Sequence, residues 1–458
     1  MLSLDKKQKK KGNMNNKSST AASNAAVENA SVDWGSKLVL FERCDTLPLH
    51  SEVELTVQFT GTVQAFDHGG IYAARTEGTS NSAEDRALLT HLEVRFARCA
   101  FPCPDDPQYR LDWQLKSVQL PDSYTAVLTN GEEQGRRALT AQRAVQRSFA
   151  PCGPLPAYSF SFACFPEPLE EVASTMAIPE FAGGIAEGLQ SHAGTIPCAT
   201  IPVRVLARRQ ARIPAATLER VLHITKEAVA TLQQRFDCPL PLLQCRHLDV
   251  LLGPTMPFIS GMEHHCCIIL NETMYQSGKK ASGGGGSAEA EQTELIIHEL
   301  AHHWMGNALG LPFPVKEGVC QVLEQCIGDT LLGKPMRKFK PDSAAVAPAG
   351  ATGNQDAAVS TKTNPISQMI QAAEKGHEFT GSSYQQALKA IRHFVADRGF
   401  AVFERSLRHI VHAQVLLPTI AVEEQGGTQM LRCVGGDVPP PPYLSTEAFL
   451  RSMKLLSS

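Results

Sequence analysis

Residues 293–310 read TELIIHELAHHWMGNALG, and this stretch decides how the rest of the chain is interpreted. His298 and His302 are four residues apart, a spacing that places both side chains on one face of an α-helix. Two imidazoles in that arrangement can bind one cation. Glu299 lies about 100° further round the helix, where it faces the cation without being a ligand. The flanking residues are mostly apolar, so the helix is expected to be buried, and buried unpaired imidazoles would be costly.

A zinc site needs a third ligand from elsewhere in the chain. Zn²⁺ accepts imidazole and carboxylate ligands and, in sites that carry out chemistry, keeps one of four positions open. The segment VKEGVCQVLEQC (315–326) follows Pro312 and Pro314 and predicts a second helix that returns against the first. Glu317 in its first turns is the preferred third ligand. Glu324, two turns further along on the same face, is the alternative.

Composition bounds the class of protein. The 458 residues leave room for about three domains. The 43 basic and 46 acidic residues give a net charge of −3, which excludes a chain-wide basic surface for nucleic acid. The sequence shows neither a run of apolar residues long enough for a membrane span nor an apolar secretory segment. Thirteen cysteines without C-x-x-C spacing suit reduced thiols, so we expect a cytoplasmic protein with no membrane partner.

Pattern changes along the chain predict its organisation. Residues 1–32 are polar and predict a disordered tail, and the run KKQKKK at 6–11 leaves a nuclear location open. Short alternating segments separated by turn residues predict an antiparallel β domain over 33–205. Helices alternating with buried strands predict a mixed α/β domain over 206–415. Residues 416–458 are expected to form a short C-terminal extension.

Individual elements can be placed within these domains. Two stretches rich in Gly, Ser and Ala, 277–292 and 342–363, predict flexible insertions. Buried strands are expected at LDVLL (248–252) and CCIIL (266–270). Helices are predicted from 3.6-residue periodicity at 215–236, 384–396 and 403–412.

Four ordered motifs resemble one known family. HELAHHWMGN (298–307), with KEG downstream, resembles the zinc aminopeptidase family of aminopeptidase N and leukotriene hydrolase, the gluzincin metallopeptidases. FARCAFPCPDDPQYRLDW (96–113) is similar to a stretch of that family's N-terminal β domain. PFISGMEHHCCIIL (257–270) is similar to its Gly-x-Met-Glu-Asn substrate strand, and SSYQQALKAIRHF (382–394) to the helix of its catalytic tyrosine. The implied fold is an antiparallel β domain followed by a thermolysin-like mixed α/β catalytic domain.

The resemblance also implies roles for the residues of the zinc motif. His298, His302 and Glu317 would bind one Zn²⁺ per chain, and Glu299 would be the general base. Tyr384 would assist at the transition state.

Further roles concern the substrate. The strand residues Gly261, Met262 and Glu263 would line the path of a peptide. Glu263 and Glu93 would bind its free N-terminal amine. The implied activity is a zinc-dependent aminopeptidase that hydrolyses the N-terminal peptide bond of short peptides.

Three departures from the family pattern leave alternatives open. Fourteen residues separate His302 from Glu317, where the family has eighteen, and His264 stands where an Asn is expected. The family's large helical C-terminal domain has no counterpart among the last 50 or so residues. A catalytically impaired binding or scaffold protein is therefore one alternative. Epoxide hydrolysis at the same zinc is another.

A second metal site is not expected from the sequence. The run His264, His265, Cys266, Cys267 is rich in ligand types, but neighbouring residues of a strand point to opposite faces, so at most two could share an ion. His303, next to His302, is expected to have a structural role.

Overall fold

The structure is a computed structural model of the whole chain. It describes residues 3–7, 25–26, 29–33, 38–42, 52–63, 66–74, 86–179, 198–254, 256, 259–276, 287–339, 381–416, 420–425, 428–433 and 443–455. The chain divides into two compact units, residues 1–62 and 63–458.

The first unit contains short antiparallel strands. One sheet has the order β2-β1-β5 and another pairs β3 with β4. Their bounds are β1 (Ser3–Lys7), β2 (Ala25–Ala26), β3 (Asn29–Asp33), β4 (Leu38–Glu42) and β5 (Glu52–Thr56). The predicted disordered tail over 1–32 is therefore wrong for the residues in β1, β2 and β3. A polar composition indicates that a segment can bury little apolar surface, but it does not exclude backbone hydrogen bonding. β1 pairs with β5 in this way, and Lys7 lies opposite Glu52 in the pair.

Three antiparallel sheets open the second unit, as the alternating sequence predicts. Their orders are β10-β14-β7-β6, β11-β12-β9 and β13-β8. The strands are β6 (Gly70–Ala74), β7 (Ala87–His91), β8 (Arg110–Trp113), β9 (Val118–Pro121), β10 (Ala126–Thr129), β11 (Glu133–Leu139), β12 (Ala144–Phe149), β13 (Cys152–Pro156) and β14 (Phe162–Phe165). A β-rich domain thus precedes the helical part of the chain, as expected.

A mixed five-stranded sheet follows, with the order β15-β16-β17-β19-β18. Its strands are β15 (Leu169–Pro179), β16 (Cys198–Arg208), β17 (Leu248–Gly253), β18 (Gly261–Met262) and β19 (Cys267–Asn271). β16 pairs in parallel with β17, and β17 with β19. The predicted domain boundary at 205 consequently falls inside β16. Alternation alone does not tell which sheet a strand joins, so the β15–β16 hairpin was assigned to the wrong domain.

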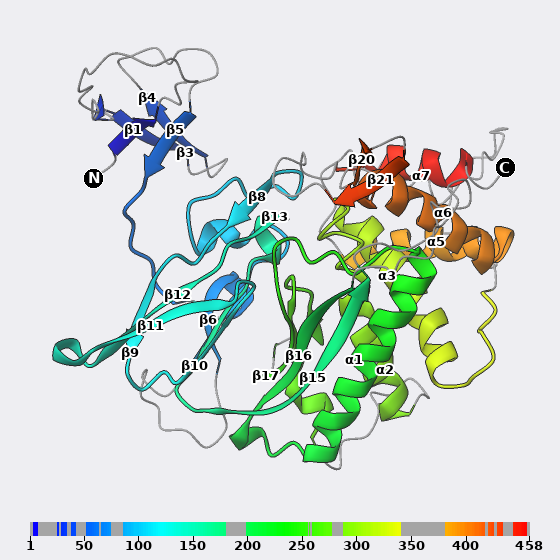
Figure 1. Cartoon of the computed structure of the whole chain (residues 1–458), viewed down its shortest axis with the longest axis horizontal. Coiled ribbons are helices and arrows are strands. Elements are labelled where there is room, and N and C mark those ends of the chain that lie inside the picture. The colour runs from blue at the N-terminus through cyan, green and yellow to red at the C-terminus, as the bar shows by residue number, and fades with distance from the viewer. Residues whose placement is uncertain are drawn as a thin grey trace, which may run out of the picture. The chain divides into compact units, whose positions relative to one another are not determined.

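The mixed sheet is a central layer covered on both faces. Residues that alternate along its strands, such as Val205 and Val250, pack with helices α1 (Ala215–Phe236) and α2 (Ala288–Ala301) in one core. Their neighbours Leu206 and Leu251 pack with the β6–β7 side of the β domain in a second core. Figure 1 shows α1 lying along β15 and β16. Because successive residues of a strand face opposite sides, the mixed sheet packs against the helices on one face and against the β domain on the other.

The remaining helices extend the core that contains α1 and α2. They are α3 (Phe313–Leu331), α5 (Gly381–Arg398), α6 (Phe400–Val411) and α7 (Thr446–Leu455). Phe449 of α7 is buried in the same core as Phe403 of α6, so the C-terminal extension packs on this domain. The extension also contains the hairpin β20 (Ile420–Gln425) and β21 (Thr428–Cys433). Among the described residues, no helix is long and apolar enough to cross a membrane.

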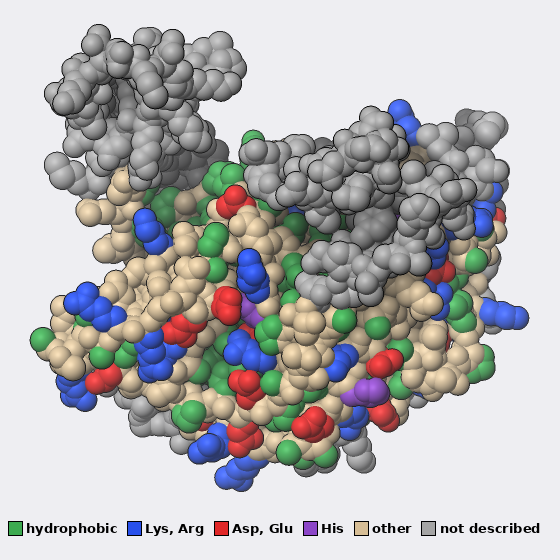
Figure 2. Space-filling model, viewed as in Figure 1, with side chains coloured by type: hydrophobic (Ala, Val, Ile, Leu, Met, Phe, Trp, Pro, Cys, Tyr) green, Lys and Arg blue, Asp and Glu red, His purple; other side chains and the backbone are tan. Residues whose placement is uncertain are grey.

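The two predicted insertions differ in outcome. Residues 342–363 lie outside the described residues, as do 277–286. The end of the first insertion is wrong, because α2 begins at Ala288 and Ser287 caps it by accepting a hydrogen bond from the Ala290 amide. Glu289 and Glu291 in the first turn favour that helix start. On the face shown in Figure 2, acidic and basic side chains are interspersed.

Candidate metal centre

The two ligand-bearing helices are joined by a tight turn. α2 ends at Ala301, so His302 is its C-cap, and α3 starts at Phe313 with a proline in its first turn. Between them, the Asn307 amide donates to the His302 carbonyl at 3.0 Å and the Leu309 amide to the Trp304 carbonyl at 2.9 Å. The compact turn accounts for the shorter spacing before Glu317, because the loop absorbs the missing residues.

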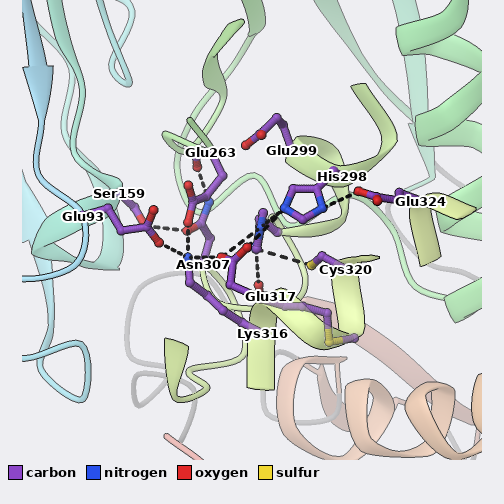
Figure 3. A network of polar contacts seen from close by, with 12 residues as sticks. Glu93, Ser159, Glu263, His298, Glu299, Asn307, Lys316, Glu317, Cys320 and Glu324 are labelled. Atoms are coloured by element: carbon purple, nitrogen blue, oxygen red, sulfur yellow. Dashed lines mark hydrogen bonds and ion pairs between the residues drawn. The ribbon is translucent and has the colours of Figure 1, made fainter. Parts of the chain in front are cut away.

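His298, His302 and Glu317 converge as predicted. The two Nε2 atoms are 3.1 Å apart, and the Glu317 carboxylate lies 3.3 Å from His298 Nε2 and 3.5 Å from His302 Nε2. Four-coordinate zinc with bonds of about 2.1 Å separates its ligand atoms by about 3.4 Å. The triangle therefore fits a zinc ion without rearrangement, and Figure 3 shows His298 and Glu317 pointing toward one another.

The outer ring nitrogens are also held. Glu324, the alternative ligand, lies outside the triangle and accepts a hydrogen bond from His298 Nδ1 at 2.6 Å. His302 Nδ1 lies 3.1 Å from the Met305 carbonyl oxygen and 3.3 Å from the Cys320 thiol. When Nδ1 carries the proton, Nε2 presents a lone pair to a metal, and such partners fix the orientation of ligand rings.

Glu299 borders the same cavity as the triangle. The cavity encloses about 400 Å³ and is lined by Glu93, Gly261, Glu263, His298, Glu299 and Glu317, among others. Burial raises the pKa of Glu299 well above its usual value, and Glu263 and Glu317 act in the same direction. A Cβ at Gly261 would lie 2.1 Å from Glu299 Oε1, so any larger residue at this position would displace the Glu299 carboxyl group.

The substrate-strand residues point to different places. Met262 packs in the core between the mixed sheet and the β domain, away from the cavity lining. His264 is fully buried, with Nε2 3.3 Å from the Thr90 carbonyl oxygen, so it faces the β domain. Asn307 donates a hydrogen bond to the Glu263 carbonyl at 2.9 Å, which holds the strand end in place.

Glu93 and Glu263 meet as expected, but at a buried lysine that sequence reasoning missed. Lys316 is 1% exposed and donates hydrogen bonds to both carboxylates. Its Nζ is 3.3 Å from Glu317 and 4.6 Å from the centroid of the Tyr158 ring. Figure 3 shows the Lys316 ammonium between the Glu93 and Glu263 carboxylates. The sequence did contain a signal for this lysine: it directly precedes the predicted ligand Glu317 in a helix whose other residues are mostly apolar, which indicates burial.

The lysine sets the charge state of the pair. Burial alone would raise the pKa of Glu263, but the Lys316 ammonium, His302 and a hydrogen bond with Glu93 together outweigh it and hold that pKa well below its usual range. Burial and the neighbouring Glu263 hold the pKa of Glu93 well above its usual range. The pKa values of the two carboxyl groups are thus shifted in opposite directions, because the two groups share one cation.

Tyr384 lies in the first turns of α5, and its side chain is outside the described residues. α5 packs against α3, the helix of Glu317. Its assigned role therefore stays a prediction.

An H-E-x-x-H helix with a carboxylate from the next helix, set beside a mixed sheet, is the arrangement of a metallopeptidase-type domain. The chain belongs to peptidase family M1. Residues 220–416 match the peptidase family M1 domain, and residues 2–159 match the peptidase M1 N-terminal domain. The resemblance stated from the sequence motifs is thereby confirmed.

Two curated relatives are similar over more than half of this chain. Protein TMA108 of Saccharomyces cerevisiae is 26% identical over 292 residues, which cover 60% of this chain and 27% of that protein. Aminopeptidase Q of Felis catus is 24% identical over 266 residues, covering 57% of this chain and 23% of that protein. The chain thus matches about a quarter of the length of these relatives.

Proposed function

We propose that this chain is a zinc-dependent aminopeptidase that hydrolyses the N-terminal peptide bond of short peptides. The observation that carries the proposal is the triangle of His298, His302 and Glu317. It borders one cavity together with Glu299 and with Glu93 and Glu263, the two residues assigned to the substrate amine. The peptidase family of the chain supports the same chemistry.

Each group around the cavity has a role in that reaction. When bound, zinc supplies a Lewis acid for water and for the peptide carbonyl. Glu299 would accept the proton of the attacking water and pass it to the departing nitrogen. Tyr384 would donate a hydrogen bond to the developing oxyanion, an assignment that rests on the family resemblance.

The charge of the cavity suits a substrate ammonium. Carboxylate oxygens of Glu93, Glu263 and Glu317 lie within 4.8 Å of one another, and Lys316 supplies one positive charge among them. With zinc bound and with Glu93 and Glu299 ionised, the carboxylates that line the cavity leave an excess of negative charge over zinc and Lys316. A peptide with a free N-terminal amine would neutralise it, whereas an internal peptide segment has no cation to offer.

Lys316 also favours a second candidate, a peptide-binding protein without turnover. Its ammonium already donates to both residues that would receive the substrate amine. Because Glu93 and Glu263 already accept hydrogen bonds from Lys316, they would hold the N-terminal amine of a peptide less firmly. The rate of hydrolysis depends on how precisely the substrate is positioned.

Hydrolysis of fluorogenic aminoacyl amides by the purified full chain distinguishes the two candidates. For the peptidase, removal of zinc by a chelator should abolish turnover and added zinc should restore it. Glu299→Gln should retain the metal and peptide binding but lose about 10²- to 10⁴-fold in kcat. Equal background rates for the wild type and Glu299→Gln, with intact peptide binding, would support the binding protein instead.

A further inference from the structure

A cluster of thiols and one imidazole lies apart from the described cavity. Cys152 begins β13, Cys245 precedes β17, and His265 and Cys266 form the turn between β18 and β19. All four are 3% exposed or less. A ring nitrogen of His265 and the sulfurs of Cys245 and Cys266 lie within 4.8 Å of one another. Cys152 packs in the same buried cluster as Cys245 and Cys266, and its thiol donates to the Trp113 carbonyl at 3.6 Å.

The backbone takes unusual conformations to bring these ligands together. Cys266 has a φ of 55°, a left-handed conformation that breaks strand alternation. The sequence argument allowed at most two ligands from this run but assumed a strand, in which adjacent residues face opposite sides; the adjacent His265 and Cys266 lie in a turn and contribute to one cluster. Leu243 and Gln244, just before Cys245, are also left-handed, with φ of 45° and 70°. Non-glycine residues hold such conformations when their surroundings require it.

Contacts to β13 hold the cysteine loop in place. The Gly153 amide donates to the Leu243 carbonyl at 2.8 Å, and the Gln244 side-chain amide donates to the Gly153 carbonyl at 3.0 Å. The loop is therefore fixed against the strand that begins with Cys152.

The histidine of the cluster has a nitrogen to spare. His265 Nε2 donates to the Leu242 carbonyl at 3.2 Å, and Nδ1 has no hydrogen-bond partner among the described residues. A neutral imidazole that donates from Nε2 keeps a lone pair at Nδ1. An unpaired polar atom in a fully buried ring is costly unless something binds it.

We propose that Cys245, Cys266 and His265, completed by Cys152, form a second zinc site with a structural role. Thiolate and imidazole are the donors of structural zinc sites, and three sulfurs with one nitrogen fill all four positions of the ion. Each thiol that binds releases its proton to solvent. The ion would join β13 of the β domain to the loops that precede β17 and β19.

The site would also support the first one indirectly. The Cys266 amide donates to His303 Nε2 at 2.9 Å, and His303 directly follows the ligand His302. The proposal does not depend on peptidase activity, because it concerns metal content alone.

Metal analysis of the full chain provides the test. The wild type should contain two zinc ions, Glu317→Ala should retain one, and Glu317→Ala with Cys245→Ala should retain none. Cobalt(II) loaded into Glu317→Ala should give a thiolate-to-cobalt charge-transfer band in the near ultraviolet. The cavity ligands cannot produce this band because they include no thiolate. Cys267→Ala is the matched control, since this neighbouring thiol packs in the core beside the β domain and its loss should leave the band unchanged.

Two results would overturn the proposal. One is a Glu317→Ala protein with neither zinc nor a cobalt charge-transfer band; this measurement keeps every thiol and so does not depend on a cysteine variant folding. The other is a disulfide found at Cys245. Cys320→Ala in the same background should leave the band unchanged, because Cys320 lies beside His302 and outside the cluster.

Discussion

The two ligand clusters of this chain differ in what surrounds them. The His298–His302–Glu317 triangle borders a cavity of about 400 Å³ and has three ligands from nitrogen and oxygen. The Cys245–His265–Cys266 cluster is enclosed among apolar side chains such as Leu155 and Leu242, and Cys152, which packs in the same cluster, is the candidate for a fourth ligand. An open position suits chemistry, whereas a filled shell suits structure. Coordination number and access thus separate the two roles within one fold.

The charges around the clusters differ as well. Around the triangle, Glu93, Glu263 and Lys316 form a buried ionic network. The thiol cluster is neutral when its cysteines are protonated, and a hydrophobic core surrounds it. Loss of metal from the triangle should therefore change activity, and loss of metal from the thiol cluster should change stability.

The largest expected effect is that of Glu317→Ala. This change removes the only carboxylate of the triangle, so zinc should leave the cavity and hydrolysis of aminoacyl amides should fall to background. The melting temperature should respond less than it does to Cys245→Ala, because the thiol cluster keeps its ligands. Metal analysis, kinetics and thermal unfolding of both variants measure the contrast. Full activity in Glu317→Ala would show that the ligand assignment is wrong.

Glu324→Ala should have a smaller effect on the same metal. The change removes the hydrogen-bond partner of His298 Nδ1 but no ligand, and loss of such a partner typically weakens metal affinity about 10- to 100-fold. Competition with a chelator of known affinity measures the difference. Glu324→Gln, whose amide oxygen can still accept the hydrogen bond, should recover much of the affinity. If Glu324→Ala loses the metal completely while Glu317→Ala retains it, Glu324 is the third ligand and Glu317 is not.

Lys316→Met should change substrate selection by about tenfold. The methionine fills a similar volume, but Glu93 and Glu263 lose their cation, and removing one partner of a buried ion pair typically costs about 3–5 kcal/mol of stability. A peptide with a free amine would replace the lost charge, so its kcat/KM relative to that of its Nα-acetylated form should rise above the wild-type ratio. Lys316→Arg, which keeps the charge, is the control. An unchanged ratio would mean that the two carboxylates do not contact the substrate amine.

The sequence predicted the convergence of His298, His302 and Glu317 because its signal is local. His298 and His302 share one helix, and Glu317 follows in the next helix after a turn of known length. Helix α1 was predicted to start at Ala215, where it does start, because a 3.6-residue period continues without interruption from that position. Patterns of this kind depend on neighbours in the chain and require no knowledge of tertiary contacts.

The features that the sequence did not predict depend on distant contacts. Lys316 pairs with Glu93, 223 residues away, and no local pattern marks that pair. The thiol cluster was missed because the left-handed turn at Cys266 breaks the alternation that the strand pattern implies. The boundary near 205 failed for a similar reason, since β16 is recognised as part of the mixed sheet only by its partner β17.

The smallest effect is expected from shortening 342–363, a segment that lies outside the described residues. Its composition is dominated by Ala, Gly, Ser and Thr, which bury little apolar area, so its removal should leave the melting temperature and the metal content nearly unchanged. Deleting these residues keeps the rest of the connection between α3 and α5. A fall in kcat/KM with unchanged metal content would instead mean that the segment covers the cavity when peptide binds. A lower melting temperature with unchanged kinetics would mean that the segment packs on the helices it connects. It would then contribute to stability and not to activity, as is expected of the thiol cluster.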